Sequence, residues 1–464
     1  MRSVAAAACG PRSRIPATGT RIRSATTALR WKRACSSPED TMTFFVLLLQ
    51  LTVLSGPPGS PFPDSFNYAI SAHSSERARV FGRPDLDTPV IGVIEQGGDF
   101  PIHEILEDRS CPGGHFLRIA RSHFVCSAHF SPSARFPARV PVVAVDETMD
   151  SSLAWRRTKV ATPVWASRAD RLAGKPAFLL PRNAHLLYRK RYVTVDGELM
   201  YLSLKDYLVA SADLEEASPS TFSGKRTDGA GDLAWAVVYR YPTVPVVDLD
   251  RGRPRRRLPD KTWVRLATAG PVERDGRKYY RLEDGWGVSG EHLRLFTLGE
   301  PPEGTAPGEP WIEVNMTSQT LVAYEGARPV FRTLISSGRV GTDTVPGLYR
   351  IYFKRAVQDV SRKRGKKVDY FFESVPFVQF FHGVFAFHSA MWHHAFGFPH
   401  SMGCVETSLR DAAFLFGWTH PRVPDGYLAL TDSVEDPGTL VRIVKFPGHR
   451  VPTRFHPRAV PPEE

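Results

Sequence analysis

The chain has 464 residues, of which 42% are hydrophobic and 23% charged, a balance that is ordinary for a soluble protein of two to four domains. Its formal net charge of +12 favours acidic partners such as nucleic acid, anionic membranes or an anionic cell-wall polymer. Abundant Pro (39) and Gly (36), with few helix-forming runs, favour an all-β or β-rich multidomain fold. No nucleic-acid module is recognisable, because the basic runs 251–257 and 362–367 lack interleaved aromatic residues and are interpreted as solvated loops.

The apolar, uncharged segment 44–54 is too short for a comfortable membrane span and suits the central region of a signal peptide. An Arg-rich stretch precedes it, and small and turn-forming residues follow it. Residues 1–63 are therefore interpreted as a leader and linker, with Met42 as a candidate true start. We expect export to the periplasm or cell envelope, and a retained single-pass anchor is the alternative.

The cysteines indicate one unpaired thiol in the exported protein. Cys9 and Cys35 lie in the leader, whereas Cys111 and Cys126 flank a predicted hairpin and are expected to form a disulfide in an oxidising compartment. Cys404 is then left over. An odd free thiol in an exported protein suggests a reactive group, and a buried, inert Cys is the alternative.

Short strands separated by Gly, Asp and Pro fill the region between the leader and residue 298. Strands are predicted at 90–94, 116–119 and 122–127. Two later hairpins are predicted to turn at Asp196-Gly197 and at Asp284-Gly285.

The hairpin pattern resembles that of bacterial SH3-like modules. On this resemblance we expect small β-barrel modules at 64–145, 146–225 and 226–298. An unrelated β-sandwich is the alternative. The modules are candidates for contact with the cell wall.

The Pro/Gly-rich segment 299–310 is the clearest linker in the chain, and it precedes a domain predicted at 311–447 with a tail at 448–464. Strands at 311–316, 320–324 and 330–336 form a predicted antiparallel meander. A turn at 344–347 leads into a further strand at 348–354.

The stretch 375–418 contains the strongest chemical signal. Residues 385–388 alternate as a strand that ends on His388, and Ser401-Met402-Gly403-Cys404 follows after a loop. A short helix is predicted from Leu409 to Phe416, with Ser408 and Asp411 as a capping pair. A thiol needs a base or a lowered pKa to become a nucleophile, so His388 facing Cys404 points to acyl-transfer chemistry. Backbone N–H groups near Gly403 and Cys404 are candidates for stabilising an oxyanion.

This stretch resembles the catalytic domain of the L,D-transpeptidase (YkuD-like) family, which carries a His on one strand and a later Ser-His-Gly-Cys motif. The matching residues are His388, Ser401, Gly403, Cys404 and Val405, and the likeness covers about 310–445. It implies a β-rich sandwich in which Cys404 attacks a peptidoglycan stem peptide, with His388 as base and no metal or organic cofactor. It also implies that Ser389, or the carbonyl that follows His388, orients the imidazole.

Two residues depart from the family's pattern. Met402 stands where a His is usual, and Glu406 stands where Asn or Arg is usual. With Ser389 and His400, they are the candidate substrate contacts. A carboxylate at 406 would repel the carboxylates of the stem peptide or select a cationic acceptor amine.

Other histidines compete for the role of base, and other functions compete with transpeptidation. His382, expected on the same strand and face as His388, is one competitor, and His393, His394 and His400 are the others. Their spacing does not indicate a zinc site. The alternative functions are a catalytically decayed cell-wall-binding protein and a Cys hydrolase or carboxypeptidase that uses water as acceptor.

Overall fold

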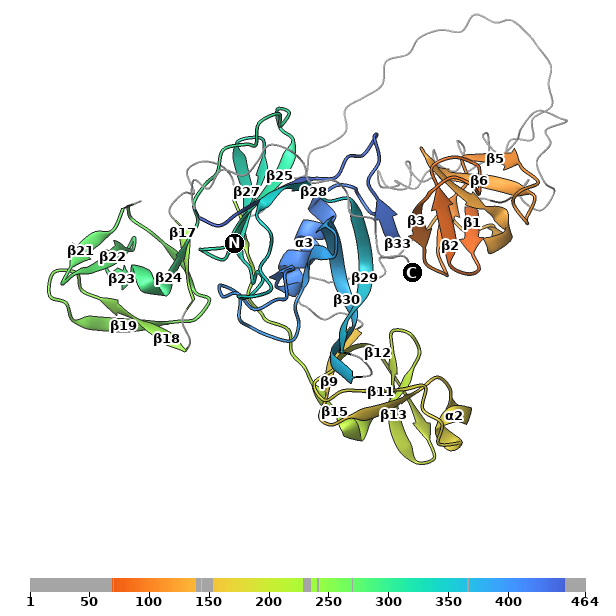
Figure 1. Cartoon of the computed structure of the whole chain (residues 1–464), viewed down its shortest axis with the longest axis horizontal. Helices are drawn as coiled ribbons and strands as arrows, with labels where there is room; N and C mark the ends of the chain where they lie inside the picture. Colours follow the sequence, from red (N-terminus) through yellow and green to blue (C-terminus); the bar gives the residue numbers. More distant parts are fainter. Residues whose placement is uncertain are drawn as a thin grey trace, which may run out of the picture. The chain divides into compact units, whose positions relative to one another are not determined.

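The computed structural model describes residue 69 and residues 71–446, except 139–142, 144–152, 228–234, 240–241, 269 and 365–366. The predicted leader, linker and tail, including the apolar segment 44–54, lie outside the described residues. Among the helices of the described part, none is long and apolar enough to cross a membrane. The fold is mostly β, as the composition predicts (Figure 1).

The first module contains short antiparallel strands around buried Phe100 and Phe116. Cys111 and Cys126 are joined by a disulfide beside Phe116. The strands are β1 (Ser71–Ser74), β2 (Ala78–Phe81), β3 (Val90–Ile94), β4 (Asp99–Pro101), β5 (Glu104–Glu107), β6 (His115–Ala120), β7 (His123–Cys126) and β8 (Phe130–Ser133).

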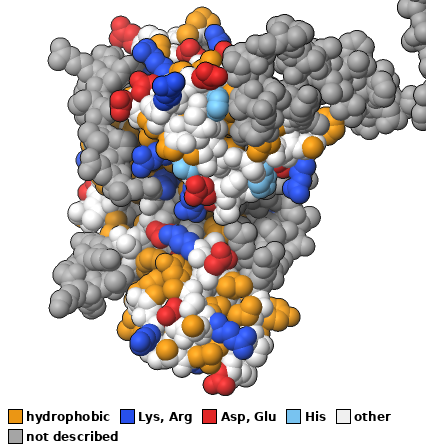
Figure 2. Space-filling view, turned by 90° about the vertical axis from the view of Figure 1, so that its right-hand side faces the viewer, with side chains coloured by type: hydrophobic (Ala, Val, Ile, Leu, Met, Phe, Trp, Pro, Cys, Tyr) orange, Lys and Arg blue, Asp and Glu red, His pale blue; other side chains and the backbone are white. Residues whose placement is uncertain are grey.

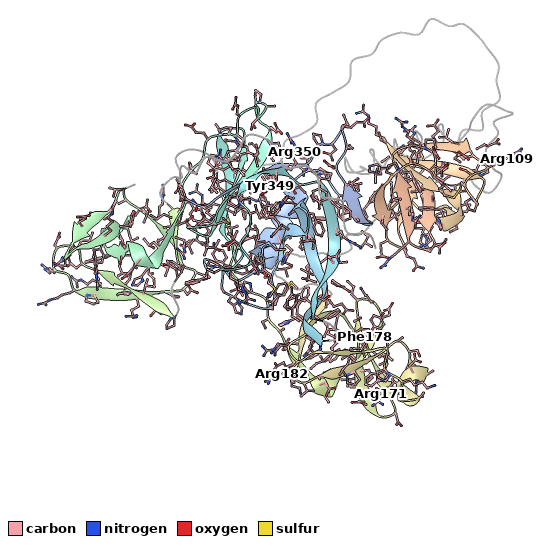
Figure 3. The ribbon with its side chains drawn as sticks, in the orientation of Figure 1. Arg109, Arg171, Phe178, Arg182, Tyr349 and Arg350 are labelled. Atoms are coloured by element: carbon pink, nitrogen blue, oxygen red, sulfur yellow. A yellow bond between two sulfur atoms is a disulfide. The ribbon has the colours of Figure 1, made fainter. Side chains whose placement is uncertain are left out.

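The second module is built around the hairpin of β12 (His185–Val195) and β13 (Glu198–Ser203). Asp196 and Gly197 both have positive φ (51° and 77°), which suits the two-residue turn expected there. Hydrophobic and charged side chains are interspersed on its surface, where Tyr192 is 65% exposed (Figure 2). Arg171 and Phe178 both project from this module (Figure 3). The other elements are β9 (Leu153–Thr158), β10 (Thr162–Trp165), α2 (Arg168–Leu172), β11 (Phe178–Leu180), β14 (Leu208–Ala210) and β15 (Leu214–Glu216).

The third module corrects two expectations. The basic run 251–257 is not wholly a loop, because Pro254–Pro259 forms the edge strand β19, in which Arg256 pairs with Asp284. The Asp284-Gly285 connection is longer than a two-residue turn, since the Leu282 N–H already donates to the Trp286 carbonyl. The remaining strands are β17 (Trp235–Val238), β18 (Thr243–Val247), β20 (Trp263–Arg265), β21 (Val272–Arg274), β22 (Arg277–Arg281), β23 (Gly287–Ser289) and β24 (Leu293–Leu295).

All three modules end in the same local pattern of strand, 3-10 turn and strand. The turns are η1 (Ser127–His129), η2 (Ser211–Asp213) and η4 (Gly290–His292), and each is followed directly by the last strand of its module. This recurrence supports an internal repeat, whereas the SH3-like assignment stays a prediction.

The C-terminal domain is a sandwich. Its core lies between a six-stranded sheet and a second layer that contains residues 385–418. That sheet has the order β16-β27-β26-β25-β34-β28. Ile312 and Phe331 on this sheet pack in one cluster with Phe387, Val405 and Leu415. Its strands are β16 (Lys225–Arg226), β25 (Pro310–Asn315), β26 (Thr320–Glu325), β27 (Arg328–Leu334), β28 (Gly347–Arg350) and β34 (Leu440–Val444).

The other elements are the long hairpin of β29 (Phe353–Arg364) and β30 (Lys367–His382), then β31 (Phe385–Ser389), β32 (Val405–Thr407), α3 (Leu409–Trp418) and β33 (Tyr427–Thr431). In Figure 1 the hairpin runs as a twisted ribbon beside α3. The Ser408 hydroxyl accepts a hydrogen bond from the Asp411 N–H, which confirms the predicted cap. The predicted strand 348–354 is instead split between β28 and β29, and Arg362–Arg364 extend β29 rather than forming a loop.

Strands of the modules also join the C-terminal domain. Strand β3 pairs antiparallel with β33, and His185 of β12 bridges to Phe372 of β30. The predicted boundary at 225/226 passes through β16, which pairs with β27. Residues 225–226 therefore extend the sheet of the C-terminal domain.

Candidate active site

Two adjacent parallel strands bring the predicted catalytic pair together. Strand β31 carries His388, and Cys404 directly precedes β32, with His388 in register with Glu406. Since side chains alternate along a strand, His388, Cys404 and Glu406 are placed on one face of this pair. The sequence could not show this pairing, because a 15-residue loop, residues 390–404, separates the two strands.

The hydrogen bond of His388 defines its tautomer. Its imidazole is 3% exposed, and Nδ1 lies 2.9 Å from the Ser389 carbonyl oxygen. A carbonyl only accepts, so Nδ1 carries the proton and Nε2 carries a lone pair. This carbonyl is the orienting group that the resemblance implies, and it leaves Nε2 as the atom able to accept a proton.

Cys404 is the free cysteine of the described residues, and it lies in apolar surroundings. It packs against a cluster that includes Phe380 and Ala386, and its thiol contacts the Val384 carbonyl at 3.8 Å. Burial raises the pKa of the thiol to about 12, although a backbone hydrogen bond from Ala386 opposes the rise. The resting thiol is therefore protonated at neutral pH.

The turn before Cys404 is braced by two hydroxyl groups. Ser401 Oγ accepts from the Gly403 N–H (3.0 Å) and donates to the Cys404 carbonyl (2.6 Å). Thr344 Oγ1 donates to the Gly403 carbonyl (2.8 Å). Thr344 is fully buried, and its bracing role was visible in the sequence only as part of a turn. Both hydroxyls act on the backbone of the turn.

Only glycine fits at position 403. Its φ is +121°, and a Cβ there would overlap Cε1 of Phe385. Both the backbone conformation and the close approach to β31 exclude a side chain. The glycine therefore positions the neighbouring Cys404 beside β31.

The other predicted site residues are placed unevenly. Ser389 is fully buried and its hydroxyl donates to the Pro376 carbonyl, and Glu406 is 5% exposed. Met402 is half-buried and His400 is exposed. His400 and Met402 thus remain accessible for the predicted substrate contacts, whereas Ser389 and Glu406 are enclosed by protein.

The competing histidines separate clearly. His382 ends β30 rather than sharing β31 with His388, which corrects the expectation of a common strand and face. Its ring lies 4.9 Å from that of Tyr349 on β28, a core position labelled in Figure 3. His394 is exposed on the loop. Register with β32 thus distinguishes His388 from these residues.

His393 lies on the loop between β31 and β32, as expected, and its side chain is only 8% exposed. Its Nδ1 accepts from the Ala395 N–H (3.0 Å), so Nε2 carries the proton and donates it to Glu406 (2.9 Å). Burial, reinforced by His388, lowers the pKa of His393 to about 3. Burial raises the pKa of Glu406 to about 7, and the neighbouring His388 and His400 oppose the rise.

His393, His400 and Glu406 also form a three-residue group whose possible ligand atoms lie within 4.8 Å of one another in the described structure. A metal ion would need the Nε2 lone pair of His393 and would move its proton to Nδ1, against the Ala395 N–H. The observed hydrogen bonds fit a polar network in which neutral His393 donates to Glu406 better than they fit a metal site.

A surface pocket of about 290 Å³ lies elsewhere, on the second module, and is lined by residues such as Ser167, Val193 and Asp206. It includes no residue of β31 or β32. The candidate site is therefore defined by the two strands and their hydrogen bonds.

Comparisons with known proteins bear on this region. Residues 309–443 match the family model of YkuD, the L,D-transpeptidase catalytic domain. A comparison with curated protein sequences gives no match.

Among solved structures, the L,D-transpeptidase of Stackebrandtia nassauensis is 24% identical over 31% of this chain and 60% of that chain, with a TM-score of 0.22. A point mutant of the Enterococcus faecium L,D-transpeptidase is 20% identical over 29% of this chain and 50% of that chain, with a TM-score of 0.23. The L,D-transpeptidase of Mycobacterium smegmatis is 13% identical over 48% of this chain and 99% of that chain, with a TM-score of 0.24. This chain thus spans 60% and 50% of the length of the first two. By the family match, the chain contains an L,D-transpeptidase catalytic domain of the YkuD family at residues 309–443.

Proposed function

We propose that the protein is a peptidoglycan L,D-transpeptidase in which Cys404 is the nucleophile and His388 its base. The observation that carries the proposal is the placement of both residues on one face of β31 and the start of β32, with the Nε2 lone pair of His388 left to accept a proton. The family match at residues 309–443 supports the reaction class. No metal or organic cofactor has a step in this reaction.

In the first half-reaction, the Cys404 S–H bond breaks and its proton moves to His388 Nε2 while sulfur attacks the carbonyl of the third residue of a stem tetrapeptide, a diamino acid. The C–N bond to the terminal D-alanine then breaks. The leaving amine takes the proton from the imidazolium, and a thioester remains. In the second half, an amine attacks the thioester and gives its proton to Nε2, the C–S bond breaks, and the leaving thiolate takes that proton back from the imidazolium. The product is a crosslinked or remodelled cell wall.

The protonated resting thiol constrains how attack begins. A pKa of about 12 makes the free thiolate scarce at neutral pH, so proton transfer to His388 accompanies attack rather than preceding it.

The oxyanion of the tetrahedral intermediate needs a nearby N–H donor. The Gly403 N–H already donates to Ser401 Oγ. The Cys404 N–H is therefore the stronger candidate, and the Ser401 and Thr344 hydroxyls serve by holding the turn in shape.

The test is acylation of the full chain by a carbapenem, followed by intact mass, beside Cys404→Ala. We expect a stable adduct on the parent protein and none on the variant. The absence of an adduct, together with no product from a disaccharide-tetrapeptide, would favour a decayed cell-wall-binding protein. Release of a tripeptide with no transfer to an added amine would favour the hydrolase.

The same proposal has three further parts. They are export to the periplasm or cell envelope, contact of the β modules with the cell wall, and contact of His400 and Met402 with substrate. Cell fractionation and co-sedimentation with isolated peptidoglycan sacculi test the first two. A cytoplasmic protein that does not sediment with sacculi would contradict them.

A further inference from the structure

Glu406 is a buried carboxylate at a position where a surface contact with substrate was expected. One of its oxygens, Oε2, accepts the Nε2 proton of His393 at 2.9 Å and lies 4.0 Å from Nδ1 of His400. Its backbone is held by reciprocal hydrogen bonds with Ser336. The carboxylate is therefore held by its surroundings at one place beside the nucleophile.

The hydrogen bond from His393 keeps that imidazole neutral. The Ala395 N–H donates to Nδ1 of His393. A proton on Nδ1 would therefore point one N–H donor at another. His393 thus orients the carboxylate without neutralising its charge. The titratable and charged groups facing this network are His388 from β31, His393, His394 and His400 from the loop, Arg339 after β27 and Lys261 from the third module.

We propose that Glu406 is a positioning residue that stabilises the imidazolium form of His388 and thereby promotes ionisation of the Cys404 thiol. This inference rests on the proposed function, in which His388 takes the thiol proton. It adds a third side chain to the predicted pair and assigns Glu406 a role other than binding substrate.

The register of the two strands supports this role. Glu406 is the direct partner of His388 across the parallel pair, where neighbouring strands lie about 4.8 Å apart. Cys404 lies two residues away along the chain, or about 6.6 Å at the rise of a strand. Attraction to His388 lowers the pKa of Glu406, whereas ionised Glu406 by itself raises the pKa of the Cys404 thiol. The role proposed for Glu406 therefore works through its strand partner His388, whose imidazolium the carboxylate attracts.

A pH dependence follows. Burial raises the pKa of Glu406 to about 7, so the carboxylate is protonated below that pH and charged above it. We expect the reactivity of Cys404 to rise through pH 7 as Glu406 ionises. This rise adds to the ordinary increase in thiolate with pH.

The experiment is the rate of Cys404 alkylation by iodoacetamide in the full chain between pH 5.5 and 9, read by peptide mass. Glu406→Gln preserves size and the acceptor for His393 but removes the charge. We expect it to slow alkylation about tenfold at pH 8, the effect of one pKa unit, and to abolish the rise near pH 7. Glu406→Asp, which keeps the charge, should stay within about threefold of the parent.

Glu373→Gln is the matched control, because Glu373 is equally enclosed and burial raises its pKa to about 7 as well. It should leave the alkylation profile unchanged. An effect of Glu406→Gln below twofold, or an equal effect of Glu373→Gln, would overturn the inference. If Glu406→Gln does not fold, the parent profile still decides, since a profile without a step near pH 7 refutes the role. Alkylation needs no peptidoglycan, so failure here is distinct from failure to acylate with a carbapenem.

Discussion

Two buried polar clusters lie near Trp392 and differ in one component. In the first, the His388 ring centroid lies 5.9 Å from that of Trp392, and Glu406 is the strand partner of His388. In the second, the His185 ring centroid lies 6.4 Å from that of Trp392, and Glu373 follows Phe372, the bridge partner of His185. Both histidines donate Nδ1–H to a backbone carbonyl, and burial raises the pKa of both glutamates to about 7.

Only the first cluster lies next to the proposed nucleophile. Cys404 stands two residues before Glu406, the strand partner of His388. In the second cluster, Glu373 accepts a hydrogen bond from the Ser203 hydroxyl, and burial raises the pKa of the Tyr188 phenol well above 10. A buried histidine with a perturbed carboxylate is therefore not sufficient to define an active site. The strand register and the turn at Gly403 supply what the second cluster lacks.

The largest effect is expected on the acylation rate, when variants of the two histidines are compared. His388→Gln removes the proton acceptor, so we expect acylation by a carbapenem to fall by about 10²–10⁴. His185→Gln keeps a donor for the Asn183 carbonyl and should stay within about threefold. Acylation rates measured by intact mass check both, and equal losses in the two variants would show that only packing around Trp392 matters.

The next effect concerns the turn. Gly403→Ala places a methyl group against Phe385, and we expect the free energy of unfolding to fall by about 3 kcal/mol. Gly341→Ala is the control, since Gly341 also has positive φ (+87°) but no atom within 4 Å of the new Cβ, and about 1 kcal/mol is expected. Urea unfolding measures both. If adding Phe385→Leu to Gly403→Ala recovers none of the stability, the steric explanation is wrong.

The two glutamates should affect stability alike but chemistry differently. The folded pKa of Glu373 is about 7 against 4.5 for the free group, so the folded protein binds the extra proton and its stability falls as pH rises through this window. Glu373→Gln should remove about 2–3 kcal/mol of that fall between pH 4.5 and 8. Glu406→Gln should do the same, yet it alone should alter Cys404. If the urea midpoint of each variant differs from that of the parent by the same amount at every pH, the assigned pKa shifts are wrong.

The smallest effect is at Tyr188. Its hydroxyl is buried and has no hydrogen-bond partner among the described residues. Tyr188→Phe should therefore change the free energy of unfolding by less than about 1 kcal/mol and leave carbapenem acylation unchanged. A larger loss of stability would reveal a hydrogen bond of this hydroxyl in solution.

Much of the fold was predictable because local patterns determine local structure. Val90–Ile94, Thr320–Glu325 and Leu409–Trp418 form where alternation or capping predicts them. Two predictions failed. The run 348–354 is divided between two strands, and the arginine run 254–259 forms an edge strand because it pairs with β18. Neither local pattern contains information about the partner strand.

The sequence by itself determined the chemistry available to this protein: an odd thiol, a histidine at a strand end and a glycine before the cysteine, in a pattern similar to one family. Only the tertiary structure decided which histidine lies on the strand paired with the one after Cys404, that Ser401 braces the turn, and that Glu406 is enclosed and hydrogen-bonded by His393. The physical reason is that strand pairing sets these contacts. The register of β31 against β32 joins residues across an intervening loop, and neither composition nor spacing encodes that register.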